Sequence, residues 1–197
     1  MRVRKARQDD VAAVVPLMHE SAPAIYDRFA GGRERALATL ERAFAEPGNV
    51  ASREVIRVAE VDGRVAAAMA AFPLVEGGDR SRSFLRITLR RLPPWRWWAA
   101  LRVFSGGGVA VQPEDSLYVD SLATVPGMRR RGAARALLEA AEHEARALGL
   151  RAVTLDTTMD NDAARALYAR AGFDEVAYRA ATPLLPGFVA LIKPVDR

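Results

Sequence analysis

Four arginines and one glycine lie together in the segment Arg129-Arg130-Arg131-Gly132-Ala133-Ala134-Arg135. The segment stands where an apolar run, 117–125, gives way to a long amphipathic helix that we expect over 130–148. A helix N-terminus carries partial positive charge and unpaired N–H groups, so acids are favoured there by about 0.3 to 1 kcal/mol. The first acid of this helix is Glu139, whereas a later helix opens with acids at 160 and 162. A bound anion such as a phosphate would reconcile the arginines with the helix start, and we predict an anion site at this turn. A solvated run of charge is the alternative, but it leaves the glycine and the missing acids unexplained.

The composition narrows the classes of protein that fit. With 197 residues, half of them hydrophobic, the chain is long enough to bury one substantial core, and we expect a single domain over 1–197. The absence of cysteine excludes disulfides, thiolate nucleophiles and Cys-based metal sites. The histidines, His19 and His143, are expected on the surface, with a position that borders the substrate as the alternative for His19. We expect no metal. The first residues lack the apolar run of a signal peptide, so we expect a cytoplasmic protein.

The net charge of +5 comes almost entirely from arginine, because Lys5 and Lys193 are the only lysines among 29 basic residues. Binding to nucleic acid is one explanation, since a basic protein attracts polyanions. Biased codon usage is the other. The overall charge therefore does not decide the function, and only the local cluster at 129–135 is informative.

The first half of the chain predicts a strand, two helices and a hairpin. The strand is expected over 3–6, the helices over 8–22 and 36–44, and the hairpin strands over 55–61 and 65–72 around Asp62-Gly63, a strong two-residue turn signal. Residues 73–114 differ, because two apolar, arginine-rich stretches, 84–92 and 95–104, meet at Pro93-Pro94 and include all three tryptophans. We interpret them as a helical insert around 78–105. The tryptophans would pack it onto its own domain or onto a dimer partner, or the insert would form a lid or a membrane-surface helix.

The second half alternates between strands and helices. Strands are expected over 117–125, 151–156, 173–180 and 183–193, and helices over 130–148 and 160–171, the latter closed by Gly172. This order predicts an α/β protein whose sheet contains parallel pairing at the crossovers.

Two motifs in this half, one with Arg129, Gly132 and Ala134 and one with Asn161, Tyr168 and Gly172-Phe173, resemble those of the GNAT superfamily of acyl-CoA-dependent N-acyltransferases. The first is Arg or Gln, two residues, Gly, one residue, then Gly or Ala, and it is met by Arg129, Gly132 and Ala134. The second is Asn followed seven residues later by Tyr and then by a Gly-Phe strand start, met by Asn161, Tyr168 and Gly172-Phe173. The resemblance is clearest over 117–178. It implies a mixed, splayed central sheet flanked by helices and acetyl-CoA as co-substrate.

The resemblance also implies where the cofactor binds. The pyrophosphate of coenzyme A would lie on the N–H groups at the start of the helix, and the pantetheine arm would pair with backbone at Leu122, Ala123 and Thr124. Asn161 would lie on the cofactor side, or it is simply a helix N-cap, and the two roles are compatible. The family often has Gly where Arg130 stands. We expect the side chain of Arg130 to point outward and leave its N–H available. The cofactor-binding residues predicted at the turn are Arg129, Arg130, Arg131, Gly132, Ala133, Ala134 and Arg135.

Chemistry at the thioester needs a group that takes a proton from the amine and one that gives a proton to the thiolate. Asp120, two residues before the pantetheine segment, is the best-placed base, either directly or through water. Its alternative is a structural role in which it binds a backbone turn. Tyr168 resembles the family's general acid at the sulfur, and its alternative is a half-buried core aromatic.

We therefore expect an acyltransferase of class EC 2.3.1 that acetylates a primary amine of an unidentified small molecule or peptide. The alternatives are a non-catalytic acyl-CoA sensor and a basic nucleic-acid-binding protein. We expect no nucleic-acid partner and no stable membrane association, and a homodimer stays open. Several acids would attract a cationic acceptor or are ordinary solvated groups: Glu20, Asp27, Glu76, Asp79, Glu114 and Asp115.

Overall fold

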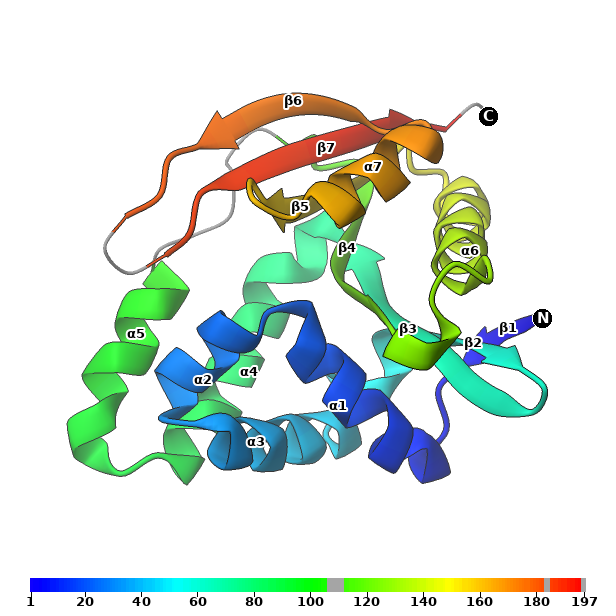
Figure 1. Ribbon diagram of the computed structural model, residues 1–197. Helices are drawn as coiled ribbons and strands as arrows, with labels where there is room; N and C mark the ends of the chain where they lie inside the picture. The colour runs from blue at the N-terminus through cyan, green and yellow to red at the C-terminus, as the bar shows by residue number, and fades with distance from the viewer. Residues whose placement is uncertain (106–111, 183–184, 196–197) are drawn as a thin grey trace.

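A seven-stranded mixed sheet forms the centre of the protein in a computed structural model that describes residues 1–105, 112–182 and 185–195 (Figure 1). The strand order is β1-β2-β3-β4-β5-β7-β6. Among the described strands, only β4 and β5 pair in parallel, because the chain crosses over through a helix between them. The strands are β1 (Arg2–Lys5), β2 (Ile56–Val61), β3 (Arg64–Pro73), β4 (Ser116–Thr124), β5 (Ala152–Thr158), β6 (Asp174–Arg179) and β7 (Phe188–Pro194).

Helices cover both faces of this sheet and enclose two hydrophobic cores (Figure 1). Alternation along β3 divides its side chains between them, with Ala68, Ala70 and Phe72 in one core and the residues between them in the other. The first core lies under α1 (Val11–Ser21), α2 (Pro23–Ala30), α3 (Arg33–Ala45), α4 (Gly77–Arg91) and α5 (Trp97–Ser105). The second lies under α6 (Ala133–Ala147) and α7 (Asp162–Arg170). Short 3-10 helices cover Gln8–Asp10, Arg53–Val55, Leu74–Glu76, Pro94–Arg96 and Pro126–Met128.

The sheet splits between its two parallel strands. β4 and β5 pair only from Ser116–Ala152 to Val119–Leu155. Beyond this point β4 continues beside β3, and β5 continues beside β7, so each strand leaves one edge without a partner strand (Figure 1). The split places free backbone groups on both sides of a wedge-shaped opening.

A β-bulge lies at the start of the split. Ala70 of β3 pairs with Ser121 and Ala71 pairs with Val119, which leaves Asp120 as an extra residue on β4. A bulge changes the direction of the side chain that it carries and bends the strand. Asp120 therefore sits where β4 turns away from β5.

Several sequence-based predictions are confirmed and others are wrong at their boundaries. The Asp62-Gly63 hairpin is confirmed, and both turn residues have the positive φ that a two-residue type I′ loop requires. The helical insert is confirmed as α4 and α5. The helix expected over 8–22 is shorter, and the sequence reading missed α2, which ends at Gly31 with φ 85°. The last strand begins at 188 rather than 183, and residues 183 and 184 lie outside the described residues.

Two of the three tryptophans do not pack onto the chain's own domain. The exposed fractions are 81% for Trp95 and 68% for Trp98, and Trp97 is also exposed while its indole N–H donates to the carbonyls of Leu89 and Leu92. Among the described ranges, none of the helices combines the length and the apolar character needed to cross a bilayer.

Candidate functional site

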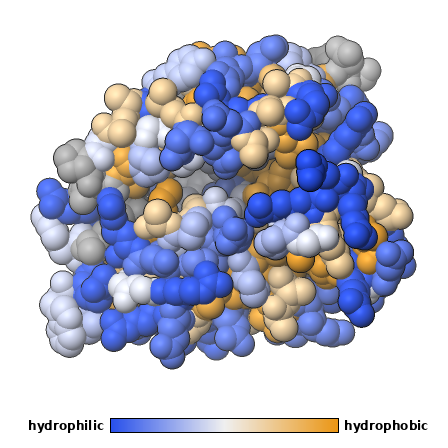
Figure 2. Space-filling model, in the orientation of Figure 1, coloured by the Kyte–Doolittle hydropathy of each residue, from blue (hydrophilic) through white to orange (hydrophobic). Residues whose placement is uncertain are grey.

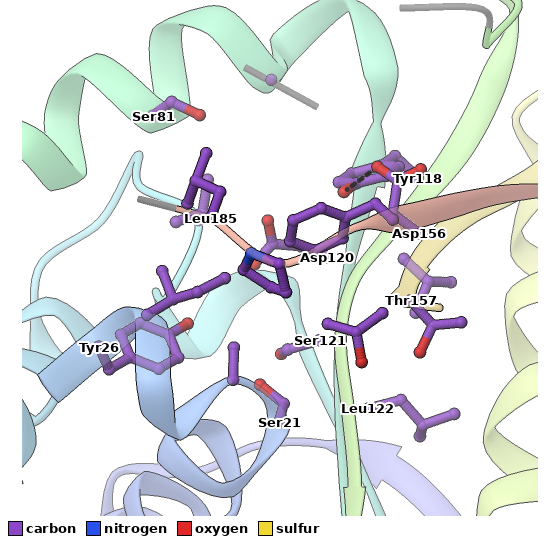
Figure 3. A pocket seen from close by; sticks show the side chains of 18 of the residues that line it. Ser21, Tyr26, Ser81, Tyr118, Asp120, Ser121, Leu122, Asp156, Thr157 and Leu185 are labelled. Carbon is purple, nitrogen blue, oxygen red and sulfur yellow. Dashed lines mark hydrogen bonds between the residues drawn. The ribbon is translucent and has the colours of Figure 1, made fainter. Parts of the chain in front are cut away.

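The opening between β4 and β5 is continuous with a cavity of about 1490 Å³. Figure 2 shows a hollow near the middle of this face, where hydrophilic and hydrophobic groups meet. One wall contains Asp120, Ser121 and Leu122 of β4, and the facing wall contains residues 156–158 of β5 (Figure 3). α1, α2 and α4 supply the remaining wall on one face of the sheet, and α7 supplies it on the other.

Asp120 directs an unpartnered carboxyl group toward this cavity. No protein group of the described ranges forms a hydrogen bond with it. Part of its surface touches the cavity, but protein surrounds it on all other sides. Burial, followed by the negative charge of Asp156, raises the pKa of Asp120 to about 7. A carboxyl group with this pKa can accept and release a proton near neutral pH.

Asp156, the second acid beside Asp120, is held in place by two hydrogen bonds. Its Oδ2 accepts from the hydroxyl of Tyr118 at 3.1 Å, and its Oδ1 accepts from Nε2 of Gln112 at 3.0 Å. The bond from Tyr118 crosses from β4 to Asp156 of β5, one residue beyond the last pair, Val119–Leu155 (Figure 3). Burial and the charges of Asp156 and Asp120 raise the pKa of Tyr118 well above its ordinary value, so Tyr118 remains a donor. The sequence reading did not single out Tyr118, Gln112 or Asp156, because no local motif joins β4 to β5.

Tyr168 lies on α7 and borders the same cavity. Its ring is 6% exposed and packs against Phe173, with the ring centres 5.9 Å apart. Its hydroxyl has no hydrogen-bond partner in the part of the chain that the structure describes, and burial raises its pKa to about 12. Tyr168 is thus both a packed aromatic and a protonated hydroxyl open to the cavity.

Asn161 is the N-cap of α7. Its Oδ1 accepts from the N–H of Ala164 at 3.2 Å, and the residue also borders the cavity. The role of helix N-cap, which the sequence analysis gave as the alternative for Asn161, is therefore confirmed. It does not prevent a role toward a ligand, because the amide nitrogen of the side chain is still available.

The turn at 129–135 ends in the helix start, but α6 begins at Ala133 rather than at Arg130. Gly132 is the N-cap with φ 83°, and Arg130 also has a positive φ of 60°. Among the described residues, none accepts a backbone hydrogen bond from the N–H groups of 130–135, and the first bond of the helix is from Ala136 to the carbonyl of Gly132. Consecutive free N–H groups in a turn with left-handed residues form an anion-binding concavity.

The arginines of this turn are exposed and differ in their partners. Arg130 points outward as expected, and like Arg131 it forms no ion pair within the described residues. Arg129 lies 3.7 Å from Glu20, and Arg135 forms an ion pair with Glu139 at 2.9 Å. The turn therefore keeps positive charge for an external anion.

The open edge of β4 leads from the cavity toward this turn. The N–H of Val125 donates to the carbonyl of Ala66 at 2.8 Å, so the backbone of Ala123, two residues earlier, also faces β3. Leu122 and Thr124 consequently direct their N–H and C=O groups to the open edge. Of the residues predicted from the sequence, Asp120, Leu122, Asn161 and Tyr168 border the cavity, whereas Ala123, Thr124 and 129–135 lie outside its lining.

His19 is not the surface residue that the sequence reading expected. It is 1% exposed, with Nε2 2.7 Å from Oδ1 of Asp27 and Nδ1 3.0 Å from Nη1 of Arg33. These contacts tie α1 to α2 and α3, so His19 shapes one wall of the cavity without lining it. His143 is exposed, as expected. The described ranges contain no group of three or more acids and histidines that could hold a metal ion.

Comparisons with known proteins agree with this fold. An N-acetyltransferase from Staphylococcus aureus Mu50 has a TM-score of 0.76 and 18% identity over 98% of this chain and 100% of that chain. A second acetyltransferase structure has a TM-score of 0.68 and 22% identity over 100% of both chains. A ribosomal-protein-alanine N-acetyltransferase from Brucella melitensis has a TM-score of 0.60 and 18% identity over 99% of this chain and 100% of that chain. At these identities the likeness shows the fold alone.

A family model establishes the class. Residues 24–173, well over half of the chain, match the model of the acetyltransferase (GNAT) family, which places the protein among the acyltransferases. The chain belongs to this GNAT acetyltransferase family, whose co-substrate is acetyl-CoA. A search of curated protein sequences finds no match.

Proposed function

We propose that this protein is an acetyl-CoA-dependent N-acetyltransferase that acetylates a primary amine of a small molecule or peptide. The proposal rests on one observation, the continuity of three features. The turn with free N–H groups, the open edges of β4 and β5, and the cavity that contains Asp120 and Tyr168 follow one another along the split.

The residues present fit the cofactor. The free N–H groups of 130–135 suit a pyrophosphate, with the exposed Arg130 and Arg131 adding charge. The outward-facing backbone of Leu122 and Thr124 suits the amides of the pantetheine arm, while Ala123 keeps this segment in the sheet. Asn161 stands at the rim on the α7 side. When bound, acetyl-CoA supplies an acetyl group on a thiol leaving group.

The two candidate catalytic residues have complementary protonation states. An alkylamine with a pKa of about 10.4 is largely protonated at neutral pH, so it must lose a proton before its nitrogen attacks the acetyl carbon. Asp120 accepts that proton as the base. As the new C–N bond replaces the C–S bond, the nitrogen loses its second proton to solvent, and Tyr168 gives its hydroxyl proton to the departing sulfur and regains one from solvent. Asp120 then releases its proton to solvent. Because a thiol with a pKa near 8.5 is already a fair leaving group, Tyr168 accelerates the reaction without being indispensable.

A thiol-release assay with acetyl-CoA and a panel of primary amines tests the proposal. We expect turnover with at least one amine, and Asp120→Asn should lower kcat/KM by about 10²- to 10⁴-fold. Asp174→Asn, an exposed acid outside the cavity, is the matched control and should retain full activity. Saturable binding of acetyl-CoA without turnover of any amine would favour the sensor instead. Salt-dependent binding of nucleic acid without binding of coenzyme A would overturn the proposal.

A further inference from the structure

The charge of the cavity is opposite to that of the chain. The chain carries a net charge of +5, yet the described residues that line the cavity include five acids and only one basic residue, Arg179. The acids are Glu20, Glu114, Asp120, Asp156 and Asp160. Since the cofactor turn is basic and the cavity is acidic, the two ends of the split attract ligands of opposite charge.

Aromatic rings form the wall of the cavity on the side of α2 and α4. Tyr26 and Phe29 lie with their ring centres 5.7 Å apart, and Phe29 and Phe84 lie 6.0 Å apart, both in edge-to-face arrangements. Phe72 and Tyr118 form a second such pair on the sheet, at 5.8 Å. All five residues line the cavity. This wall is apolar and is therefore suited to an apolar or aromatic body.

Of the acids that line the cavity, Asp120 is the one best placed to bind a cationic ligand. Asp156 already has two hydrogen bonds, whereas Asp120 has no hydrogen-bond partner among the described residues. The negative charge of Asp120 contributes to the raised pKa values of both Tyr26 and Tyr118, so Asp120 lies near these two rings (Figure 3). An ammonium ion at this position would pair with the carboxylate and contact the aromatic wall.

Taking the proposed function as given, we propose that the acceptor is a primary ammonium compound with an aromatic or similarly apolar body and without a carboxylate next to the amine. The ammonium binds to Asp120, and the apolar body lies against the rings contributed by α2, α4, β3 and β4. A carboxylate next to the amine would be placed beside Asp120 and Asp156, where like charges repel. A linear diamine would meet the acids but leave the aromatic wall unfilled.

Isothermal titration calorimetry tests this with protein saturated with coenzyme A, which supplies no acetyl group for turnover. The probes are 2-phenylethylamine, phenylalanine, which adds only a carboxylate, 2-phenylethanol, which lacks the amine, and putrescine, which lacks the ring. We expect 2-phenylethylamine to bind most tightly and phenylalanine to bind at least about 100-fold more weakly. Because the pKa of Asp120 is about 7, binding at pH 7 should release about half a proton, measured in buffers of different ionisation enthalpy.

Variants separate this inference from the function on which it rests. Asp120→Asn should remove both the affinity for 2-phenylethylamine and the proton release, while Asp174→Asn should change neither. Equal binding of phenylalanine or 2-phenylethanol, tighter binding of putrescine, or full affinity in Asp120→Asn would overturn the inference. If coenzyme A binds and none of the probes does, the inference fails and the cofactor site stands. If coenzyme A does not bind, the proposed function fails as well.

Discussion

Replacing Asp120 by Asn should stabilise the protein at neutral and higher pH while it lowers activity. In the folded protein, burial and Asp156 raise the pKa of Asp120 from 3.8 to about 7. The folded state therefore holds this proton more tightly than the unfolded chain. Stability is highest when the group is protonated in both states, falls as the pH rises from about 4 to about 7, and stays low above that range. Asn has nearly the same shape and cannot ionise, so it does not incur this loss.

The size of the effect follows from the shift. At 1.36 kcal/mol per pKa unit, ionisation of Asp120 lowers the free energy of unfolding by about 4 kcal/mol in total, and by about 3 kcal/mol between pH 5 and pH 8. This is an upper limit, because Asp120 faces a cavity that solvent enters. For a chain of 197 residues, 1 kcal/mol corresponds to roughly 2 to 4 °C in Tm, so the advantage of Asp120→Asn should grow by up to about 6 to 12 °C between pH 5 and pH 8.

Differential scanning calorimetry of wild type, Asp120→Asn and Asp174→Asn at pH 5, 6, 7 and 8 measures this directly. The gain in Tm of Asp120→Asn should increase with pH, and the Asp174→Asn control should follow wild type throughout. A gain that is the same at pH 5 and pH 8, or a loss of stability at pH 8, would show that Asp120 is not the buried, unpaired acid described above. A gain that grows with pH, together with the loss of turnover, would make Asp120 a site that trades stability for activity.

Three further predictions concern the neighbours of Asp120 and the start of α7. Asp156→Asn removes the negative charge that helps to raise the pKa of Asp120, so the acid limb of the kcat/KM profile should move below pH 7; an unshifted limb would refute the coupling. Tyr168→Phe should lower kcat by about 10²- to 10⁴-fold where chemistry limits the rate, and an unchanged kcat would show that Tyr168 is not the general acid. The same variant should change the free energy of unfolding by less than about 1 kcal/mol, because the hydroxyl of Tyr168 has no hydrogen bond to lose among the described residues. Asn161→Ala should cost about 1 kcal/mol in chemical denaturation because it removes the N-cap of α7, and no loss would contradict that role.

The sequence predicted most of the elements because their signals are local. The Asp62-Gly63 turn fixes the hairpin through two positive φ angles, and Gly172 ends α7 after a clear amphipathic repeat. The start of α6 was misplaced by three residues, because Arg130 adopts a left-handed conformation that only a glycine signals in a sequence. The buried position of His19 was missed because Asp27 and Arg33, its partners, lie on separate helices.

The parts of the candidate site that lie within one continuous segment could be predicted from the sequence. The parts that depend on how separate strands and helices pack together could not. The turn at 129–135 and Tyr168 could be predicted because each belongs to a motif within one continuous segment of the chain. The bulge that isolates Asp120 depends on the register between β3 and β4, and the bond from Tyr118 to Asp156 depends on β4 and β5 meeting from distant parts of the chain. The aromatic wall opposite Tyr168 likewise combines α2, α4, β3 and β4.

The central claim is that the turn before α6 binds the diphosphate of acetyl-CoA through its backbone N–H groups. Titration calorimetry of acetyl-CoA into wild type, Gly132→Ala and Gly149→Ala tests it most directly. Both glycines flank α6 with similar positive φ angles, 83° and 70°, and an added Cβ meets only ordinary contact or open space. Both variants should lose about 1 to 2 kcal/mol of stability, since alanine is strained in this conformation. Saturable binding to wild type and Gly149→Ala, with clearly weaker binding to Gly132→Ala, is the predicted result. Equal binding by all three proteins, or no heat of binding for wild type, would contradict it.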